Sequence, residues 1–126
     1  MDNRPIGIFD SGVGGLTVAK EILKALPNEN IVYFGDTARV PYGDKSTEVV
    51  TKYSKQIVRF LLTKNVKAII TACNTVSSNS LEALRAEFDV PFVGVVEPGV
   101  KSAVSTTVNK KVGVIGTEAT IRSNMY

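Results

Sequence analysis

The chain has no histidine, and this absence narrows the chemistry open to it. No histidine can act as a general base or a metal ligand, and a thiol without a histidine partner is unlike the site of a cysteine protease. The single cysteine, Cys73, cannot form an internal disulfide. Its isolation fits a reducing compartment.

Long hydrophobic runs are also missing. Residues 1–5 are polar or charged apart from Met1 and Pro5, and no long apolar stretch follows them, so the sequence predicts neither a signal peptide nor a membrane span. We expect a cytoplasmic protein. The net charge of +3 is mild and basic residues are mixed with acidic ones, so no basic stripe predicts a nucleic-acid surface. With 126 residues, the chain is long enough for one domain and too short for two complete ones.

Short apolar runs alternate with amphipathic segments along the chain. The runs are continuous and rich in β-branched residues, as expected of strands buried on both faces. The expected strands are Ile6–Phe9, Ile31–Phe34, Ala68–Thr71, Phe92–Val96 and Lys111–Ile115. Repeated strand–helix units predict an α/β fold of three layers, with a mostly parallel sheet and helices on both faces.

Helical patterns occupy the segments between these runs. The expected helices cover residues 16–26, residues 50–61 with Ser46 or Thr47 as N-cap, residues 81–88 with Ser77 or Ser78 as N-cap, a segment from Pro98, and a segment from Thr117. The last of these contains no glycine, proline or other stop signal, so we expect its helix to be still running at Tyr126.

Polar loops follow the strands and would therefore gather at one edge of the sheet. In the first loop, residues 10–15, the glycines allow a ligand close to the backbone and a helix N-terminus follows, which suits a carboxylate or a phosphate. A tight strand–helix turn explains the same glycines. The loop lacks the lysine of a phosphate-binding loop, and Thr17 takes the place of the third glycine of a dinucleotide fingerprint. Asp36 does stand where a ribose-binding acid would stand, so a dinucleotide-binding module stays open.

Two reactive groups lie at or just after the ends of expected strands. Cys73 follows a strand directly and is a candidate nucleophile or proton carrier, although an isolated cysteine is more often an inert core residue. Asp10 ends the first strand. Its carboxylate could cap its own loop, relay protons for the thiol or hold a substrate ammonium group.

The other loops offer further polar groups. The backbone amides of Tyr42 and Gly43 could bind an anion, although the Tyr42 ring could simply cover the core rim. In the loop of residues 116–120, Thr117 is expected to be an N-cap rather than a ligand contact.

Five segments carry one family resemblance: residues 7–18 (GIFDSGVGGLTV), 33–43 (YFGDTARVPYG), 72–75 (ACNT), 96–99 (VEPG) and 116–120 (GTEAT). In this order they resemble the glutamate racemases of the aspartate/glutamate racemase superfamily. The resemblance implies cofactor-independent interconversion of L- and D-glutamate, which supplies D-glutamate for peptidoglycan, with no metal. Two cysteines flank the substrate Cα, because inverting a stereocentre by deprotonation needs an acid and a base on opposite faces.

The same resemblance assigns roles to residues of this chain. Cys73 is one of the two cysteines, and Asp10 assists catalysis or holds the ammonium group. The implied substrate-binding positions are Asp10, Ser11, Pro41, Tyr42, Gly43, Asn74, Thr75, Thr117 and Thr120. The implied partner is the small-molecule substrate, with no nucleic acid and no membrane, and the full-length enzyme is expected to be a homodimer.

One departure from the family concerns length. Family members are about twice as long, and their second half carries the other cysteine in a Gly-Cys-Thr-His context that is absent here. The chain therefore resembles an N-terminal half of a two-domain racemase fold. Residues 1–96 would form most of a flavodoxin-like or Rossmann-like first domain, without its completing C-terminal segment, and residues 97–126 would begin a second domain. We expect this chain alone to be inactive. The alternatives are a racemase of another acidic amino acid such as aspartate, or a non-catalytic anion- or nucleotide-binding module.

Overall fold

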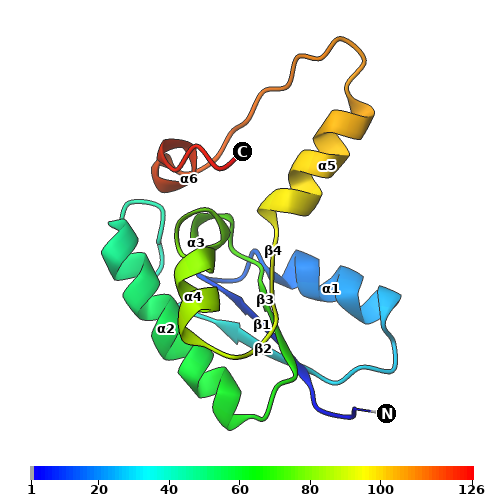
Figure 1. The fold of residues 1–126 in the computed structure, drawn as a ribbon, viewed down its shortest axis with the longest axis vertical. Coiled ribbons are helices and arrows are strands. Elements are labelled where there is room, and N and C mark those ends of the chain that lie inside the picture. Colours follow the sequence, from blue (N-terminus) through cyan, green and yellow to red (C-terminus); the bar gives the residue numbers. More distant parts are fainter. Residues whose placement is uncertain (1) are drawn as a thin grey trace.

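Four parallel strands form a sheet in the computed structural model, which describes residues 2–126. The strands are β1 (Ile6–Asp10), β2 (Ile31–Gly35), β3 (Ala68–Thr71) and β4 (Phe92–Gly94). They lie in the order β2-β1-β3-β4, so β1 pairs with both β2 and β3 (Figure 1). After β1 the chain adds β2 on one side of it, and then β3 and β4 on the other side, so the order of the strands reverses between β1 and β3. Open α/β sheets bind ligands beyond the carboxyl ends of the strands at such a switch point.

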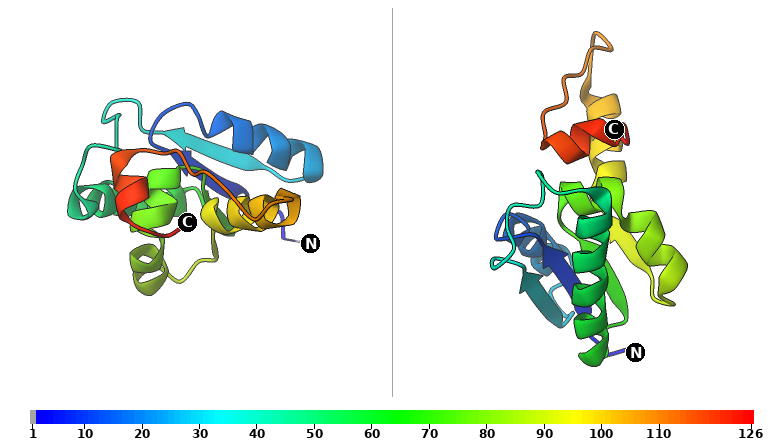
Figure 2. Two further views of the ribbon diagram at one scale, coloured as in Figure 1. Left: turned by 90° about the horizontal axis from the view of Figure 1, so that it is seen from above. Right: turned by 90° about the vertical axis from the view of Figure 1, so that its left-hand side faces the viewer.

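Helices cover both faces of the sheet, as predicted. Helix α1 (Leu16–Ala25) lies on one face, and α2 (Thr47–Thr63), α3 (Asn74–Asn79) and α4 (Leu81–Glu87) lie on the other (Figure 2). Helices α5 (Val96–Thr106) and α6 (Glu118–Arg122) lie beyond the carboxyl edge.

The core is divided by the alternation of side chains along the strands. Ile8 points to one face and packs in a cluster with Ala19 of α1. Phe9 and Ile69 point to the other face and pack in a cluster with Leu61 of α2. Burial of each of these larger side chains contributes about 1.5–3 kcal/mol to the free energy of folding, and together they hold the strand ends in place.

The helical region after β3 differs from the prediction. We expected Ser77 or Ser78 to be an N-cap, but both lie inside α3, whose N-cap is Cys73. Their hydroxyls serve other acceptors: Ser77 Oγ donates to the Thr71 carbonyl at 3.0 Å and Ser78 Oγ to the Asn74 carbonyl at 2.7 Å. The polar loop that we expected after the third strand is therefore replaced by a helix that begins at Asn74. The Ser46 cap of α2 is confirmed, since its hydroxyl accepts from Val49 N at 3.3 Å.

The fifth predicted strand, Lys111–Ile115, is wrong. Residues 111–117 have no regular secondary structure and run from the tip of α5 back to α6 (Figure 1). β-branched residues favour a strand only where a neighbouring strand pairs with them, and no such neighbour exists within residues 2–126.

Three boundaries near the C-terminal end also move. β4 ends at Gly94 because α5 already begins at Val96, two residues before the predicted start at Pro98. The last helix, α6, ends at Arg122 and does not run to Tyr126. Asn124 takes a φ of 56°, the left-handed conformation that commonly ends helices.

The division into domains at residue 96 stays a prediction. Among residues 2–126, none of the helices combines the length and the apolar character that crossing a bilayer requires.

Candidate functional site

The predicted site residues gather at the carboxyl edge of the sheet, around β1 and β3. Asp10 is the last residue of β1, and Cys73 lies two residues after the end of β3. Because these strands are neighbours, the loops that follow them meet. The Cys73 Sγ atom lies 3.5 Å from the Ser11 Oγ atom, so thiol and hydroxyl are in hydrogen-bond contact.

The Asp10 carboxylate is held by its own loop. Asp10 Oδ2 accepts hydrogen bonds from the backbone N–H groups of Gly12, at 3.2 Å, and Gly15, at 3.0 Å. A Cβ atom on Gly15 would lie 2.6 Å from Asp10 Cβ and 2.8 Å from Ala72 Cβ, so this close approach requires glycine. Of the roles open to Asp10, loop capping is therefore observed. The same two amides are occupied, which argues against this loop as a phosphate cradle.

Cys73 contacts both Ser11 at the site and the apolar core. It is only 6% exposed and belongs to the apolar cluster beneath α2 and α3. Its carbonyl accepts from Ser77 N at 2.9 Å, which fixes the start of α3. The core and the start of α3 thus fix the position of the thiol, and proton transfer requires a group held in a fixed position.

Tyr33 is a site residue that the sequence analysis missed. It comes from β2, and its hydroxyl donates to the Gly12 carbonyl at 3.2 Å, supporting the glycine loop from the side. Burial raises the pKa of Tyr33, and the nearby Asp10 and Cys73 raise it further. Tyr33 begins the resemblance segment of residues 33–43, but an aromatic residue in an apolar run is indistinguishable from a core position, so the sequence gives no sign that its hydroxyl reaches the glycine loop.

The loop after β2 turns its tyrosine inward. The Tyr42 hydroxyl donates to the Asp36 carboxylate, and Arg39 Nε lies 2.7 Å from Asp36 Oδ2. Burial raises the pKa of Tyr42 far above its usual value, and the bond to Asp36 adds to the effect. Asp36 is 4% exposed and already paired, so the geometry argues against its role as a ribose-binding acid.

Helix α6 completes the site with hydroxyl groups. Thr75 Oγ1 lies 2.9 Å from Thr117 Oγ1 and 3.5 Å from Thr120 Oγ1, and the last two are 3.0 Å apart. Thr117 is also the N-cap of α6, as predicted, and accepts from Thr120 N at 3.3 Å. A Cβ atom on Gly43 would lie 2.5 Å from Thr117 Cβ, so the loop after β2 packs directly on this helix.

The remaining predicted residues lie at the rim. The Asn74 side chain is exposed and its Oδ1 accepts from the Tyr126 hydroxyl. Pro41 is exposed, and its carbonyl accepts from Lys45 Nζ. A cavity of about 600 Å³ is lined in part by Asn74, Thr117 and Thr120.

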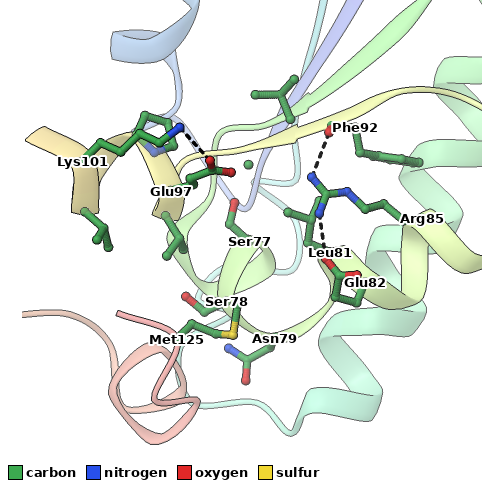
Figure 3. Close-up of a pocket in the computed structure, with 15 residues that line it drawn as sticks. Ser77, Ser78, Asn79, Leu81, Glu82, Arg85, Phe92, Glu97, Lys101 and Met125 are labelled. Carbon is green, nitrogen blue, oxygen red and sulfur yellow. Dashed lines mark hydrogen bonds and ion pairs between the residues drawn. The ribbon is translucent and has the colours of Figure 1, made fainter.

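A second cavity, of about 720 Å³, lies apart from the predicted residues. It is open to one side and is bordered by α3, α4, β4 and α5 (Figure 3). Glu97 is paired with Lys101 at 2.8 Å on one wall, and Arg85 donates to the Phe92 carbonyl at 3.1 Å on the other. Glu97, in the segment of residues 96–99 that carries part of the family resemblance, lies in the first turn of α5 and lines this cavity. Residues 2–126 contain no cluster of three or more acidic or cysteine side chains that could hold a metal ion.

Comparison with known proteins gives one consistent result. Residues 6–126 match the Asp/Glu/Hydantoin racemase family. A glutamate racemase of Geobacter metallireducens is 59% identical over 126 residues, which cover 100% of this chain and 47% of that protein. The chain spans about half the length of the curated relatives it matches.

Solved structures agree with this result. A glutamate racemase isoform of Bacillus anthracis superposes with a TM-score of 0.95 at 47% identity, covering 100% of this chain and 47% of that one. A glutamate racemase of Francisella tularensis, solved in complex with D-glutamate, gives a TM-score of 0.89 at 49% identity, with the same coverage. The family match spans nearly the whole chain, and the predicted α/β architecture is confirmed. The chain belongs to the Asp/Glu/Hydantoin racemase family.

Proposed function

We propose that the full-length protein interconverts L- and D-glutamate without a cofactor, with Cys73 as one of two proton-transferring cysteines. The observation that carries this proposal is the Cys73 thiol held against Ser11, at the reversal point between β1 and β3. Similarity to glutamate racemases, one of them solved with D-glutamate, supports glutamate as substrate.

The proposed reaction is a proton transfer at Cα. The Cys73 thiolate takes the Cα proton, so an S–H bond forms as the C–H bond breaks, and the electron pair moves onto Cα and its carboxylate. A second cysteine, from the part of the protein beyond this chain, returns a proton on the opposite face. The reverse direction exchanges the two roles.

The other site residues hold the substrate. Ser11, Asn74 and Thr75 border the thiol, and the amides of Tyr42 and Gly43 suit a carboxylate, with Pro41 shaping their turn. Thr117 and Thr120 extend the hydroxyl cluster around Thr75. Asp10, fixed by Gly12 and Gly15, is suited to hold the substrate ammonium group or to assist proton transfer.

The wider role follows from the family. We propose a cytoplasmic homodimer that supplies D-glutamate for peptidoglycan, with residues 1–96 in one domain and residues from 97 beginning another. Since the 126 residues contain one cysteine, we propose that they do not racemise glutamate alone, because one thiol cannot serve both faces of Cα.

The full-length protein with Cys73→Ala tests the proposal. We expect racemisation to fall by about a thousandfold or more in both directions, as loss of a proton-transferring group predicts. Circular dichroism of glutamate measures it, and exchange of the Cα proton in D₂O separates the two half-reactions. Lys20→Ala, on the exposed side of α1, is the control and should leave turnover unchanged. Undiminished turnover in the Cys73→Ala protein would sink the proposal.

Aspartate is the second candidate substrate, because the family description includes both amino acids. Assaying L-aspartate and L-glutamate side by side with the full-length protein decides between them. We expect glutamate to be the preferred substrate.

A further inference from the structure

The loop from Asp36 to Gly43 is fastened at both ends. Asp36 directly follows β2, and its backbone N–H donates to the Asp10 carbonyl at 3.0 Å. Six residues later, the Tyr42 side chain returns to the Asp36 carboxylate. The loop is therefore closed on itself by a buried hydrogen bond next to the strand that carries Asp10.

Arg39 neutralises the buried carboxylate and anchors the loop to α2. Its Nε lies 2.7 Å from Asp36 Oδ2, and its guanidinium lies 4.3 Å from the centre of the Tyr53 ring. The Tyr42 ring packs on the same Tyr53 ring at 5.8 Å. The Asp36 side chain is only 4% exposed, and its Oδ2 atom contacts both the Tyr42 hydroxyl and Arg39 Nε. Burying a carboxylate costs free energy unless such partners are held in place.

In the backbone of residues 41–43, the carbonyl groups form hydrogen bonds but the N–H groups of Tyr42 and Gly43 do not form any with the described residues. The carbonyls of Pro41, Tyr42 and Gly43 all accept hydrogen bonds, from Lys45 Nζ, from Lys45 N at 3.1 Å and from Ala119 N at 3.2 Å. Within residues 2–126, no backbone carbonyl accepts from the N–H groups of Tyr42 and Gly43. Because the acceptors are occupied and the donors are not, this turn is prepared for an anion.

We propose that Asp36 is a positioning residue for substrate binding, acting through the Tyr42 phenol to aim the Tyr42 and Gly43 amides at a substrate carboxylate. This inference rests on the proposed function. Asp36 does not touch the substrate. Its neutralisation by Arg39 also keeps a negative charge from opposing the anionic substrate. Releasing the phenol lets the turn relax and weakens carboxylate binding, while the thiol, fixed by β3 and α3, stays in place.

Kinetics of the full-length protein test this role through Tyr42→Phe, Asp36→Ala and the double variant. We expect each single variant to raise KM for both enantiomers by about tenfold, with kcat changed less than about threefold, because the lost interaction serves binding rather than the chemical step. The double variant should be no worse than the poorer single one, since both remove the same contact. Asp44→Asn, an exposed aspartate on the same connection, is the matched control and should change neither constant.

An unchanged KM in Tyr42→Phe overturns the positioning role, and so does a fall in kcat at constant KM that tracks the amount of folded protein. Titration with D-glutamate keeps this test separate from that of the proposed function. If the wild-type protein binds D-glutamate without racemising it, and Tyr42→Phe weakens that binding, the positioning role stands and the proposed function fails. If the wild-type protein racemises and Tyr42→Phe does not raise KM, the positioning role alone fails. A wild-type protein that neither binds nor racemises D-glutamate overturns both.

Discussion

The sheet body and the C-terminal arm use similar apolar residues with opposite results. In the body, residues 2–95, side chains such as Ile8 and Leu61 are completely buried between strands and helices. In the arm, residues 96–126, Val108 and Ile115 are each 98% exposed, and a Cβ atom added to Gly113 would have no heavy atom within 4 Å except those of its two chain neighbours. Local residue type therefore does not decide burial here. The body has neighbouring strands to pack against, and most of the arm has none within residues 2–126.

Truncating a large apolar side chain should show the largest difference in stability between the body and the arm. We expect Leu61→Ala to lower the free energy of unfolding of the 126-residue chain by about 2–5 kcal/mol, because it leaves a cavity between α2 and the sheet. Ile115→Ala, the matched change in the arm, should alter it by less than about 0.5 kcal/mol. Urea unfolding followed by circular dichroism measures both. Equal losses would mean that the arm is packed in solution.

Adding a methyl group to glycine gives a smaller contrast of the same kind. Gly15→Ala should destabilise the chain by about 1–3 kcal/mol, because the new Cβ would overlap Asp10 and Ala72. The new methyl group in Gly113→Ala contacts no other part of the chain, so we expect no loss of stability. We expect the change either to be neutral or to stabilise the chain by about 0.4–1 kcal/mol, because alanine lowers the conformational entropy of the unfolded state. The same urea titration decides, and a neutral Gly15→Ala would contradict the close packing of the glycine loop.

Alkaline pH should reveal the buried tyrosine of the body. Burial raises the pKa of Tyr42 in the folded state, so above the ordinary tyrosine pKa of about 10 the unfolded chain loses this proton first. Stability from the protonated phenol is thus complete below about pH 10 and falls as pH rises beyond it. Urea midpoints between pH 8 and 11 measure the slope. Tyr42→Phe should flatten it, whereas Tyr126→Phe, in the arm, should change it less.

Sequence patterns predicted the body better than the arm, for a physical reason. Runs such as Ala68–Thr71 are buried on both faces, and their composition alone marks them as strands. Lys111–Ile115 is also short and rich in β-branched residues, but a strand needs a partner strand as well, which a local pattern does not supply. The start of α3 was missed because the expected caps, Ser77 and Ser78, form hydrogen bonds with backbone carbonyls instead.

The site could be predicted for residues that are marked by their type and by their position after a strand. It could not be predicted for residues whose role depends on the direction of the side chain. Asp10 ends β1 and Cys73 follows β3 closely, so their loops lie at one edge of the sheet as expected, and the pairing of these two strands brings the loops together. The inward turn of Tyr42 onto Asp36 could not be read from the loop, because a tyrosine beside glycine is equally compatible with an exposed ring. Tyr33 was hidden for the converse reason, since a strand residue gives no sign that its hydroxyl reaches a loop carbonyl.

The central position of β1 also bears on how the protein folds. Ile8 pairs with Tyr33 on one side and with Ile70 on the other, so neither neighbour comes from an adjacent hairpin. The pairing of β1 with β3 closes a long interval of chain and brings Ser11 to Cys73, and such non-local pairing is slow. A sheet in which β1 and β3 are not yet paired would lack the contact between these two side chains.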